Sequence, residues 1–297
     1  MLTQPACLTC IIGDVQSAAE LVTDDAQLRL AVTRRSLAYL AEHFDGTEPP
    51  STHITAVHRI LKEVTGVAVP FAERRQAANR VGLAIRQRLA AEVATLSDER
   101  QRLRLLATWA LAANSLDSRT AGHGYSFDPE KAYDYIATYV QRGLAVDQLD
   151  CLFDAVATGA RIVYIHDNVG EIALDGLFIC HLRRMGAHVT SAVRGGPITS
   201  DATWDDAISV GLNDDAEAVI LAGPDTLGVS FKEMSAELRT ALSNADLVIT
   251  KGQANYYVFS AYRSSVPGKV FALFTIKCEP VARVWGVQPR SMIAAFL

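Results

Sequence analysis

The first half of the chain carries its apolar residues at intervals of three and four, which is the spacing of one face of an α-helix. This pattern, interrupted by short polar turns, predicts helices at 15–22, 26–41, 53–64, 72–94, 98–113, 128–141 and 146–158. This half is therefore predicted to be almost entirely helical.

From residue 161 the pattern changes to short apolar, β-branched runs that alternate with helical stretches. Strands are predicted at 161–166, 188–194, 217–222, 246–250 and 269–276, and helices at 171–185, 203–211, 231–243, 253–263 and 278–285. Such alternation favours a mostly parallel sheet with helices on both faces. We therefore predict an α/β protein with two domains. A helical bundle or cap domain spans 1–158, and a Rossmann-like, three-layer α/β/α domain spans 159–297.

The first predicted strand, RIVYIH, runs directly into DNVGEIALD at 167–175. Asp167 and Asn168 therefore fall at the carboxyl end of a strand, where open α/β sheets bind ligands. Gly170 permits a tight turn, and the free N–H groups of a helix that begins at Glu171 can hold an anion. Carboxylate and amide oxygens beside an anion site suit a hard divalent cation. The alternative is that Asp167 or Asn168 only caps the helix.

The later strand ends add further polar residues at the same sheet edge. Arg194 and Asp201 follow the second strand, and Asp201 is either a third oxygen ligand or the N-cap of the next helix. Asp225 follows the third strand, as a site residue or as part of a Pro-Asp turn. Lys251 ends the fourth strand, where a lysine can neutralise phosphate charge, and Asn255 lies in the helix that follows it.

Composition narrows the classes of function. The 297 residues carry a net charge of −5, which argues against nonspecific nucleic-acid binding, and no apolar stretch approaches the length of a membrane span. The N-terminus does not resemble a signal peptide. Five cysteines at irregular spacing do not suggest a disulfide framework, so a reducing, cytoplasmic setting is expected. Cys7 and Cys10 form a Cys-x-x-Cys pair, which is either a metal or redox site or two half-buried thiols at a helix start.

Four blocks occur in a characteristic order: DNVGEIALD, RGGPITSDA, ITKGQANYY and KCEPVARVWGV. In this order and at these intervals they resemble the damage-control phosphatase family, earlier catalogued as a domain of unknown function, which includes the human acidic-residue methyltransferase-like protein. The Cys-x-x-Cys resembles the prokaryotic branch of the family, and ANSLD at 113–117 resembles a further block. The resemblance covers nearly the whole chain.

The resemblance implies metal-dependent hydrolysis of phosphate monoesters of small metabolites, with Mn, Co, Ni or Mg. It implies metal ligands at Asp167, Asn168 and Asp201, and a catalytic lysine at Lys251. Asn114 and Asp117 match family positions that would let the helical half cover the site. Together with the strand-end pattern, this predicts substrate-binding residues at Asn114, Asp117, Gly170, Glu171, Arg194 and Asn255.

Four departures from the family pattern stand near the site: His166 before the Asp-Asn pair, Ser200 where the family has Asn, Ala254 where it has Gly, and Tyr257 where it has Glu. We expect a metal-dependent phosphatase acting on a small phosphorylated metabolite, such as a sugar phosphate or a phosphorylated cofactor or intermediate. Either a metal-activated water or Asp167 itself would attack phosphorus. The alternatives are a non-catalytic phosphometabolite-binding accessory protein and a carboxyl methyltransferase. The second would need an adenosylmethionine pocket, and no Gly-rich loop follows the first strand. No nucleic-acid or membrane partner is expected.

Overall fold

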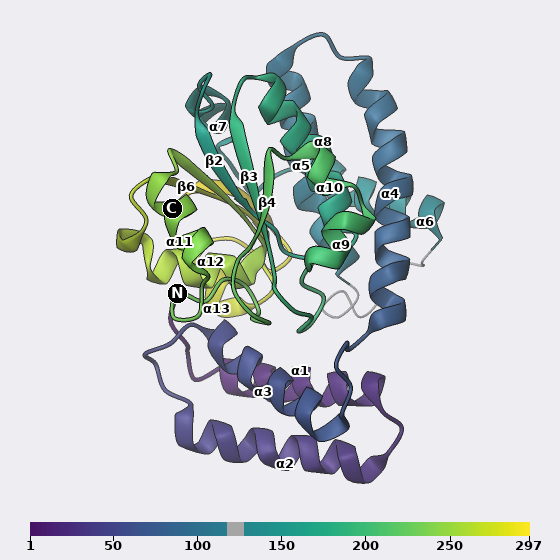
Figure 1. Ribbon diagram of the computed structural model, residues 1–297, viewed down its shortest axis with the longest axis vertical. Helices are drawn as coiled ribbons and strands as arrows, with labels where there is room; N and C mark the ends of the chain where they lie inside the picture. Colours follow the sequence, from purple (N-terminus) through teal and green to yellow (C-terminus); the bar gives the residue numbers. More distant parts are fainter. Residues whose placement is uncertain (118–127) are drawn as a thin grey trace.

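The computed structural model describes residues 1–117 and 128–297. Its helices are connected by short turns and surround one sheet (Figure 1). The helices are α1 (Cys7–Val22), α2 (Ala26–His43), α3 (Pro50–Thr65), α4 (Ala72–Ala94), α5 (Glu99–Ala112), α6 (Pro129–Arg142), α7 (Leu149–Ala155), α8 (Glu171–Arg184), α9 (Trp204–Ser209), α10 (Leu212–Asp215), α11 (Ala236–Asn244), α12 (Gly252–Ala261) and α13 (Glu279–Trp285), with the 3₁₀ helices η1 (Ala113–Leu116) and η2 (Arg263–Ser265).

The strands of the described residues form a seven-stranded sheet in the order β1-β7-β6-β5-β2-β3-β4. They are β1 (Val146–Asp147), β2 (Arg161–Ile165), β3 (His188–Val193), β4 (Ala218–Leu221), β5 (Leu247–Lys251), β6 (Lys269–Thr275) and β7 (Met292–Phe296). All neighbours pair in parallel except β6 and β7, which are antiparallel. The predicted α/β class with a mostly parallel sheet is confirmed.

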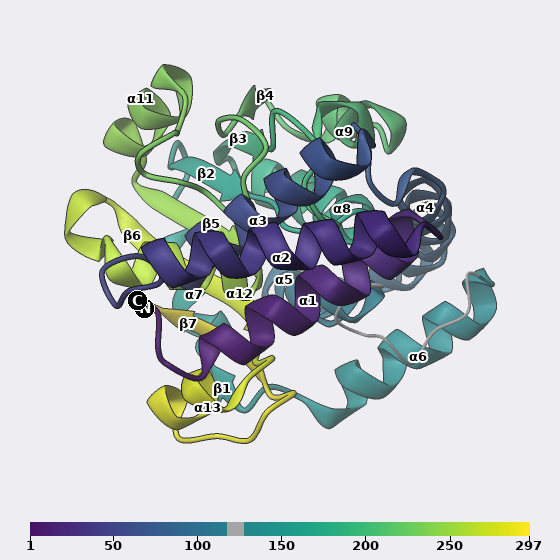
Figure 2. The same ribbon diagram turned by 90° about the horizontal axis from the view of Figure 1, so that it is seen from below.

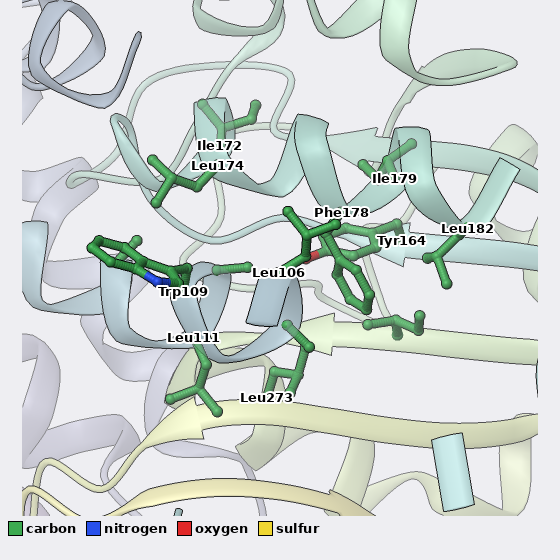
Figure 3. Packing of buried hydrophobic residues seen from close by; sticks show 14 of the residues in the cluster. Leu106, Trp109, Leu111, Tyr164, Ile172, Leu174, Phe178, Ile179, Leu182 and Leu273 are labelled. Atoms are coloured by element: carbon green, nitrogen blue, oxygen red, sulfur yellow. The ribbon is translucent and has the colours of Figure 1, made fainter. Parts of the chain in front are cut away.

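Side chains alternate between the two faces of the sheet along each strand, and both faces are covered by helices, which gives three layers. On β2, Ile162 and Tyr164 belong to the core shared with α4, α5 and α8, whereas Val163 and Ile165 belong to the core shared with α11 and α12. Successive side chains of a strand point to opposite faces, so a strand that is apolar at every position is covered on both sides. Figure 3 shows the first of these cores, where Phe178 of α8 lies beside Tyr164.

Helices α1, α2 and α3 have an apolar core of their own, formed by residues including Val15, Val32 and Leu61. Figure 1 shows these helices together at one end of the molecule, and Figure 2 views the sheet through them. They reach the edge at which β3 and β4 end, because Lys62 of α3 donates to Pro197 O at 3.0 Å and to Asp225 at 2.6 Å. Helices α1 to α3 thus lie across the carboxyl ends of the strands.

Several predicted elements differ from the observed ones. The segment predicted as a helix at 146–158 begins as strand β1 and becomes helical only at Leu149. Strand β7 and helix α10 were not predicted, and α1 begins eight residues earlier than the predicted 15–22 helix. The domain boundary predicted at residue 158 stays a prediction. Strand β1 from the first half pairs within the sheet of the second half, and α4 and α5 pack into the core of that sheet.

Candidate active site

The two acidic strand ends are joined directly. Asn168 and Asp201 form an isolated antiparallel bridge, in which Val169 N donates to Ser200 O at 2.9 Å and Ala202 N donates to Asp167 O at 2.7 Å. The loops after β2 and β3 are therefore held side by side. This places Asp167, Asn168 and Asp201 in one cluster, in which each is at most 4% exposed.

Two amides bridge the carboxylates beside β2. Asn114 Nδ2 lies 3.0 Å from both Asp167 Oδ2 and Glu171 Oε2. Asn168 Nδ2 lies 2.7 Å from Asp167 Oδ2 and 3.1 Å from Glu171 Oε2. One oxygen of each carboxylate is thus fixed by amide donors. Asn114 therefore contacts Asp167 directly, and its predicted role in substrate binding stays a prediction.

A second set of contacts brings Asp117 and Lys277 to the same cluster. Ser200 Oγ lies 2.8 Å from both Asp117 Oδ1 and Asn168 Oδ1, and its single proton can go to only one of them at a time. The Lys277 ammonium donates to Asp117 Oδ2 at 3.0 Å. Lys277 retains about a quarter of its side-chain exposure, at 27%. A partly exposed cation therefore lies beside the buried oxygens.

The carboxylates of the cluster repel one another electrostatically. Burial raises the pKa of Asp167 well above its usual range, and the negative charges of Asp201 and Glu171 raise it further. The nearby charges of Lys277 and Arg194 oppose this effect only in part. Although burial acts to lower it, the charges of Asp117 and Asp167 raise the pKa of the Lys277 ammonium. The cluster would be stabilised by an additional positive charge.

Asp201 is positioned by donors that leave it no freedom to turn. Arg194 Nε donates to Asp201 Oδ2 at 2.8 Å, and the backbone N–H of Gly228 donates to the same oxygen at 3.0 Å. Thr199 Oγ1 donates to the other oxygen at 3.0 Å. Arg194 is only 1% exposed. Arg194 thus holds Asp201, while its buried Nη1 has no hydrogen-bond partner among the described residues. Its predicted role in substrate binding stays a prediction.

Lys251 also lies away from the exposed side of the cluster. Its ammonium is fully buried and donates to Glu171, to Asp175 at 2.7 Å and to Ala110 O at 2.9 Å. Burial acts to lower the pKa of Lys251, but the charges of Asp175 and Glu171 raise it overall. With three acceptors, this ammonium has no donor left for a phosphate. The contacts of Lys251 therefore differ from those expected of a catalytic lysine that binds a phosphate.

The backbone N–H groups of the turn at Gly170 form hydrogen bonds within the protein. Gly170 N donates to Asn79 Oδ1 of α4 at 2.8 Å, and Val169 N donates to Ser200 O. Gly170 has φ +76, and a Cβ there would lie 2.7 Å from Ala78 O. The glycine is needed because α4 packs onto this turn. These two amides are therefore not available to an anion, whereas the anion site expected at the N–H groups of the helix from Glu171 stays a prediction.

Asn255 lies under the cluster and ties the strand ends together. Its Nδ2 donates to His166 O at 3.1 Å and to Lys251 O at 2.8 Å, and its Oδ1 accepts from Val229 N at 2.9 Å. The side chain is fully buried. All its contacts are with backbone groups or Arg194, so it supports the site instead of forming its exposed wall.

Lys277 was the residue that sequence reasoning missed. It was quoted in the block KCEPVARVWGV but received no role, although it follows the end of strand β6 just as Lys251 ends β5. The strand-end position was the available signal. Arg75 of α4 was also missed. It donates to Thr199 O at 2.9 Å and Asp201 O at 2.8 Å, and nothing distinguishes it locally from the other arginines of α4.

The cysteines do not form disulfides. All five are free, and the partly buried Cys278 is close enough to influence the pKa of Cys7 and Cys10, which burial raises in both. Among residues 1–117 and 128–297, no three His, Cys, Asp or Glu side chains converge as a metal cluster. The candidate set at the strand ends has two carboxylates, and its third member, Asn168, is an amide.

The comparison with known proteins identifies the family. A family model described as the damage-control phosphatase ARMT1-like domain matches residues 3–293. A protein of Archaeoglobus fulgidus named damage-control phosphatase is 34% identical over 295 residues, which cover 99% of each chain. The chain belongs to the damage-control phosphatase family.

Other damage-control phosphatases agree with this placement. A protein of that name from Pyrococcus horikoshii is 29% identical over 296 residues, covering 99% of this chain and 97% of the relative. The crystal structure of a DUF89 family protein from the same organism matches with a TM-score of 0.86 and 27% identity, covering 99% of this chain and 98% of that one. Membership of the family supports a phosphatase role. Within the described part of the chain, no helix combines the length and apolarity needed to cross a bilayer.

Proposed function

We propose that this protein is a metal-dependent phosphatase that hydrolyses the phosphate monoester of a small metabolite, such as a sugar phosphate or a phosphorylated cofactor or intermediate. The observation that carries the proposal is the bridge between the loops after β2 and β3. It holds Asp167 and Asp201 together beside the partly exposed Lys277. Two carboxylates and one cation at the carboxyl edge of a parallel sheet are suited to a phosphate with its metal.

The residues present fit a divalent cation. Asp167, Asn168 and Asp201 offer carboxylate and amide oxygens, which are the donors that Mg²⁺ and Mn²⁺ prefer. The raised pKa of Asp167, caused first by burial and then by the charges of Asp201 and Glu171, shows that positive charge is lacking there. We propose that these three residues hold Mn²⁺, Co²⁺, Ni²⁺ or Mg²⁺. Such an ion would polarise the phosphoryl group and activate a water.

Lys277 supplies the second positive charge that a phosphate monoester requires. A phosphate monoester carries nearly two negative charges at neutral pH, and two carboxylates largely cancel the charge of one divalent ion. Lys277 reaches Asp117 from strand β6 at 3.0 Å and remains partly exposed. Asp117 holds this ammonium at the edge of the cluster, where it can contact the phosphoryl oxygens.

Lys251 acts through its neighbours. Its charge offsets Glu171 and Asp175, and Glu171 in turn accepts from Asn114 and Asn168, the amides that fix Asp167. Lys251 is therefore a positioning residue in this proposal. The five free cysteines support a reducing compartment such as the cytoplasm.

Phosphate release from p-nitrophenyl phosphate and from a panel of sugar phosphates tests the proposal. Chelator-treated protein should be inactive, and Mn²⁺, Co²⁺, Ni²⁺ or Mg²⁺ should restore turnover. Asp167→Asn should remove metal-dependent activity by at least about a hundredfold, the scale for losing one charge-stabilising group. Asp205→Asn is the matched control, because Asp205 is an exposed residue of α9. Binding of the sugar phosphates without any phosphate release would instead favour a non-catalytic accessory protein.

A further inference from the structure

A cavity of about 360 Å³ lies between the end of α6 and the segment that precedes β7. Its walls come from two stretches that are far apart in sequence. They include Tyr139, Arg142, Pro289, Arg290 and Ser291. None of these residues belongs to the strand-end cluster described above.

The strand order places this cavity at the same edge of the sheet as the candidate active site, next to β7 and β1, with β6 and β5 lying between them and β2. Strand β7 is antiparallel to β6, so the residues just before Met292 lie where β6 ends. Arg290 N donates to Ile276 O at 2.7 Å, and Ile276 N donates to Ser291 O at 2.9 Å. Ile276 is followed directly by Lys277. Strand β1 is parallel to β7, which brings the end of α6 to the same edge. Figure 2 shows β1, β7 and α13 on the same side of the molecule.

The cavity carries two cations that have no acidic partner within residues 1–117 and 128–297. Arg142 and Arg290 are both exposed, whereas Arg104 on the neighbouring α5 pairs with Asp147 and Asp150. Arg142 lies over the Tyr139 ring, with its guanidinium carbon 4.9 Å from the ring centre, which fixes its direction.

Both guanidinium groups act on a single neighbouring hydroxyl. Burial raises the pKa of the Tyr135 hydroxyl to about 12, with a further contribution from Tyr139, and the charges of Arg290 and Arg142 oppose that rise. The two positive charges therefore act on the same hydroxyl, which lies 3.2 Å from the hydroxyl of the cavity residue Tyr139, even though they come from segments almost 150 residues apart in sequence.

The backbone of Arg290 is held in a conformation that L-residues rarely adopt. Its φ is +69, and Phe71 is the only other non-glycine residue with positive φ in the described part of the chain. Such a conformation persists only where the surrounding structure imposes it, and it concentrates at ligand sites. Here Arg290 N donates to Ile276 O at 2.7 Å, and Arg290 lines the cavity.

We propose that this cavity binds a second anionic group, a phosphate or a carboxylate, of the same metabolite whose phosphate monoester lies at Asp167 and Lys277. The inference rests on the proposed function and names its substrate class, which is metabolites with two anionic groups. Arg142 and Arg290 bind the second group and thereby select the substrate. Guanidinium groups suit this role because their planar donors match the oxygens of phosphate and carboxylate.

Glucose 6-phosphate and glucose 1,6-bisphosphate form a matched pair for the test, since they differ by one phosphate. The wild-type protein with metal should give a higher kcat/KM for the bisphosphate. In the double variant Arg142→Gln/Arg290→Gln, the ratio of the two kcat/KM values should fall by at least about tenfold, the scale of one charge-assisted hydrogen bond. The control Arg34→Gln/Arg283→Gln removes the same charge from exposed positions outside the cavity and should keep the wild-type ratio.

An unchanged ratio in the double variant, or an equal fall in the control, overturns the inference. If the wild-type protein releases phosphate from neither sugar, the proposed function fails and the cavity is judged by binding. Isothermal titration with glucose 1,6-bisphosphate should then show affinity at least about tenfold weaker in the double variant than in the wild-type protein. Equal affinity, or no binding to wild-type protein, overturns the inference by this route as well. Arg290→Lys should retain part of the ratio, because it keeps the charge at the same strained position.

Discussion

Asp167 rests directly on the backbone of Gly252: a Cβ atom at residue 252 would lie 1.9 Å from Asp167 Oδ2. Gly252 has φ +78 and starts α12 directly after Lys251. The end of β5 therefore forms the floor under the carboxylate at the end of β2, and the position of the candidate metal ligand depends on the absence of a side chain in the neighbouring strand.

Gly252→Ala should displace Asp167 and reduce kcat/KM for metal-dependent phosphate release by at least about a hundredfold, as expected for losing one preorganised group. Gly286→Ala is the control. Gly286 also has positive φ, at +65, but a Cβ there would meet nothing within 4 Å. Both variants should lose about 1–2 kcal/mol from backbone strain. Equal activities of the two variants would show that the contact with Asp167 is unimportant.

Lys277→Ala should lower kcat/KM by about a hundredfold or more, because it removes the partly exposed cation that we propose contacts the phosphoryl group. Metal affinity, followed by titration, should change little, since lysine is not a ligand. Lys277→Arg keeps the charge beside Asp117 and should recover part of the rate. Wild-type turnover in Lys277→Ala would contradict the proposed role of Lys277 in binding the phosphoryl group.

Lys251→Met should act mainly on stability. The substitution leaves Glu171 and Asp175 buried with no cation between them, and removing one partner of a buried pair costs about 3–5 kcal/mol. Urea unfolding of this variant should show that loss. Lys269→Met, at an exposed position of β6, should unfold at nearly the wild-type midpoint. A loss of activity without loss of stability would instead return Lys251 to a direct role.

His53 should make the protein sensitive to mild acid. It is 1% exposed and packs beside Tyr39 and Phe44, with ring centres 6.2 Å and 5.4 Å away. Burial lowers its pKa in the folded protein, and the charges of Asp45 and Glu48 oppose this only in part. The folded state therefore favours the neutral ring.

The sign of the pH effect follows from that direction. Above the unfolded-state value of about 6.5 the ring is neutral in both states, and the stability is fully present. As the pH falls from there toward the lower folded pKa, the unfolded state binds a proton first and stability is lost. The free energy of unfolding of His53→Phe should therefore fall less steeply between pH 7 and pH 5. A slope equal to that of the wild-type protein would contradict the prediction.

Strands β2 to β6 could be predicted because each is a mainly apolar run that alternates with helices, although two of the four residues of β4 are exposed. Strand β1 could not, since its two residues, Val146 and Asp147, are extended only because they pair with Ile293 and Ala294 of β7. Strand β7 is a short run that contains two alanines, and alanine is depleted in strands. Its antiparallel direction depends on long-range pairing with β6, which local pattern does not contain.

The two strand-end lysines show which feature of the site could not be predicted from sequence, namely the direction of each basic side chain. Both Lys251 and Lys277 follow apolar strands, so strand position alone treats them alike. What separates them is Glu171 and Asp175, spaced four residues apart on α8, which bring two buried carboxylates to Lys251. The convergence of Asp167, Asn168 and Asp201 was accessible from sequence, because all parallel strands end at one edge. The orientation of each basic side chain required the packing of α8.

The order of synthesis constrains when this site can exist. Strand β7 lies between β6 and β1, so a strand near the end of the chain must be inserted beside one that was made about 145 residues earlier. Until residues 292–296 leave the ribosome, β1 has no neighbour in the sheet, and the cavity that Arg290 shares with Arg142 has only one wall. Among the strand pairs of the described sheet, β1 and β7 join the segments that lie furthest apart in sequence, so the cavity between Arg142 and Arg290 depends on its longest-range pairing.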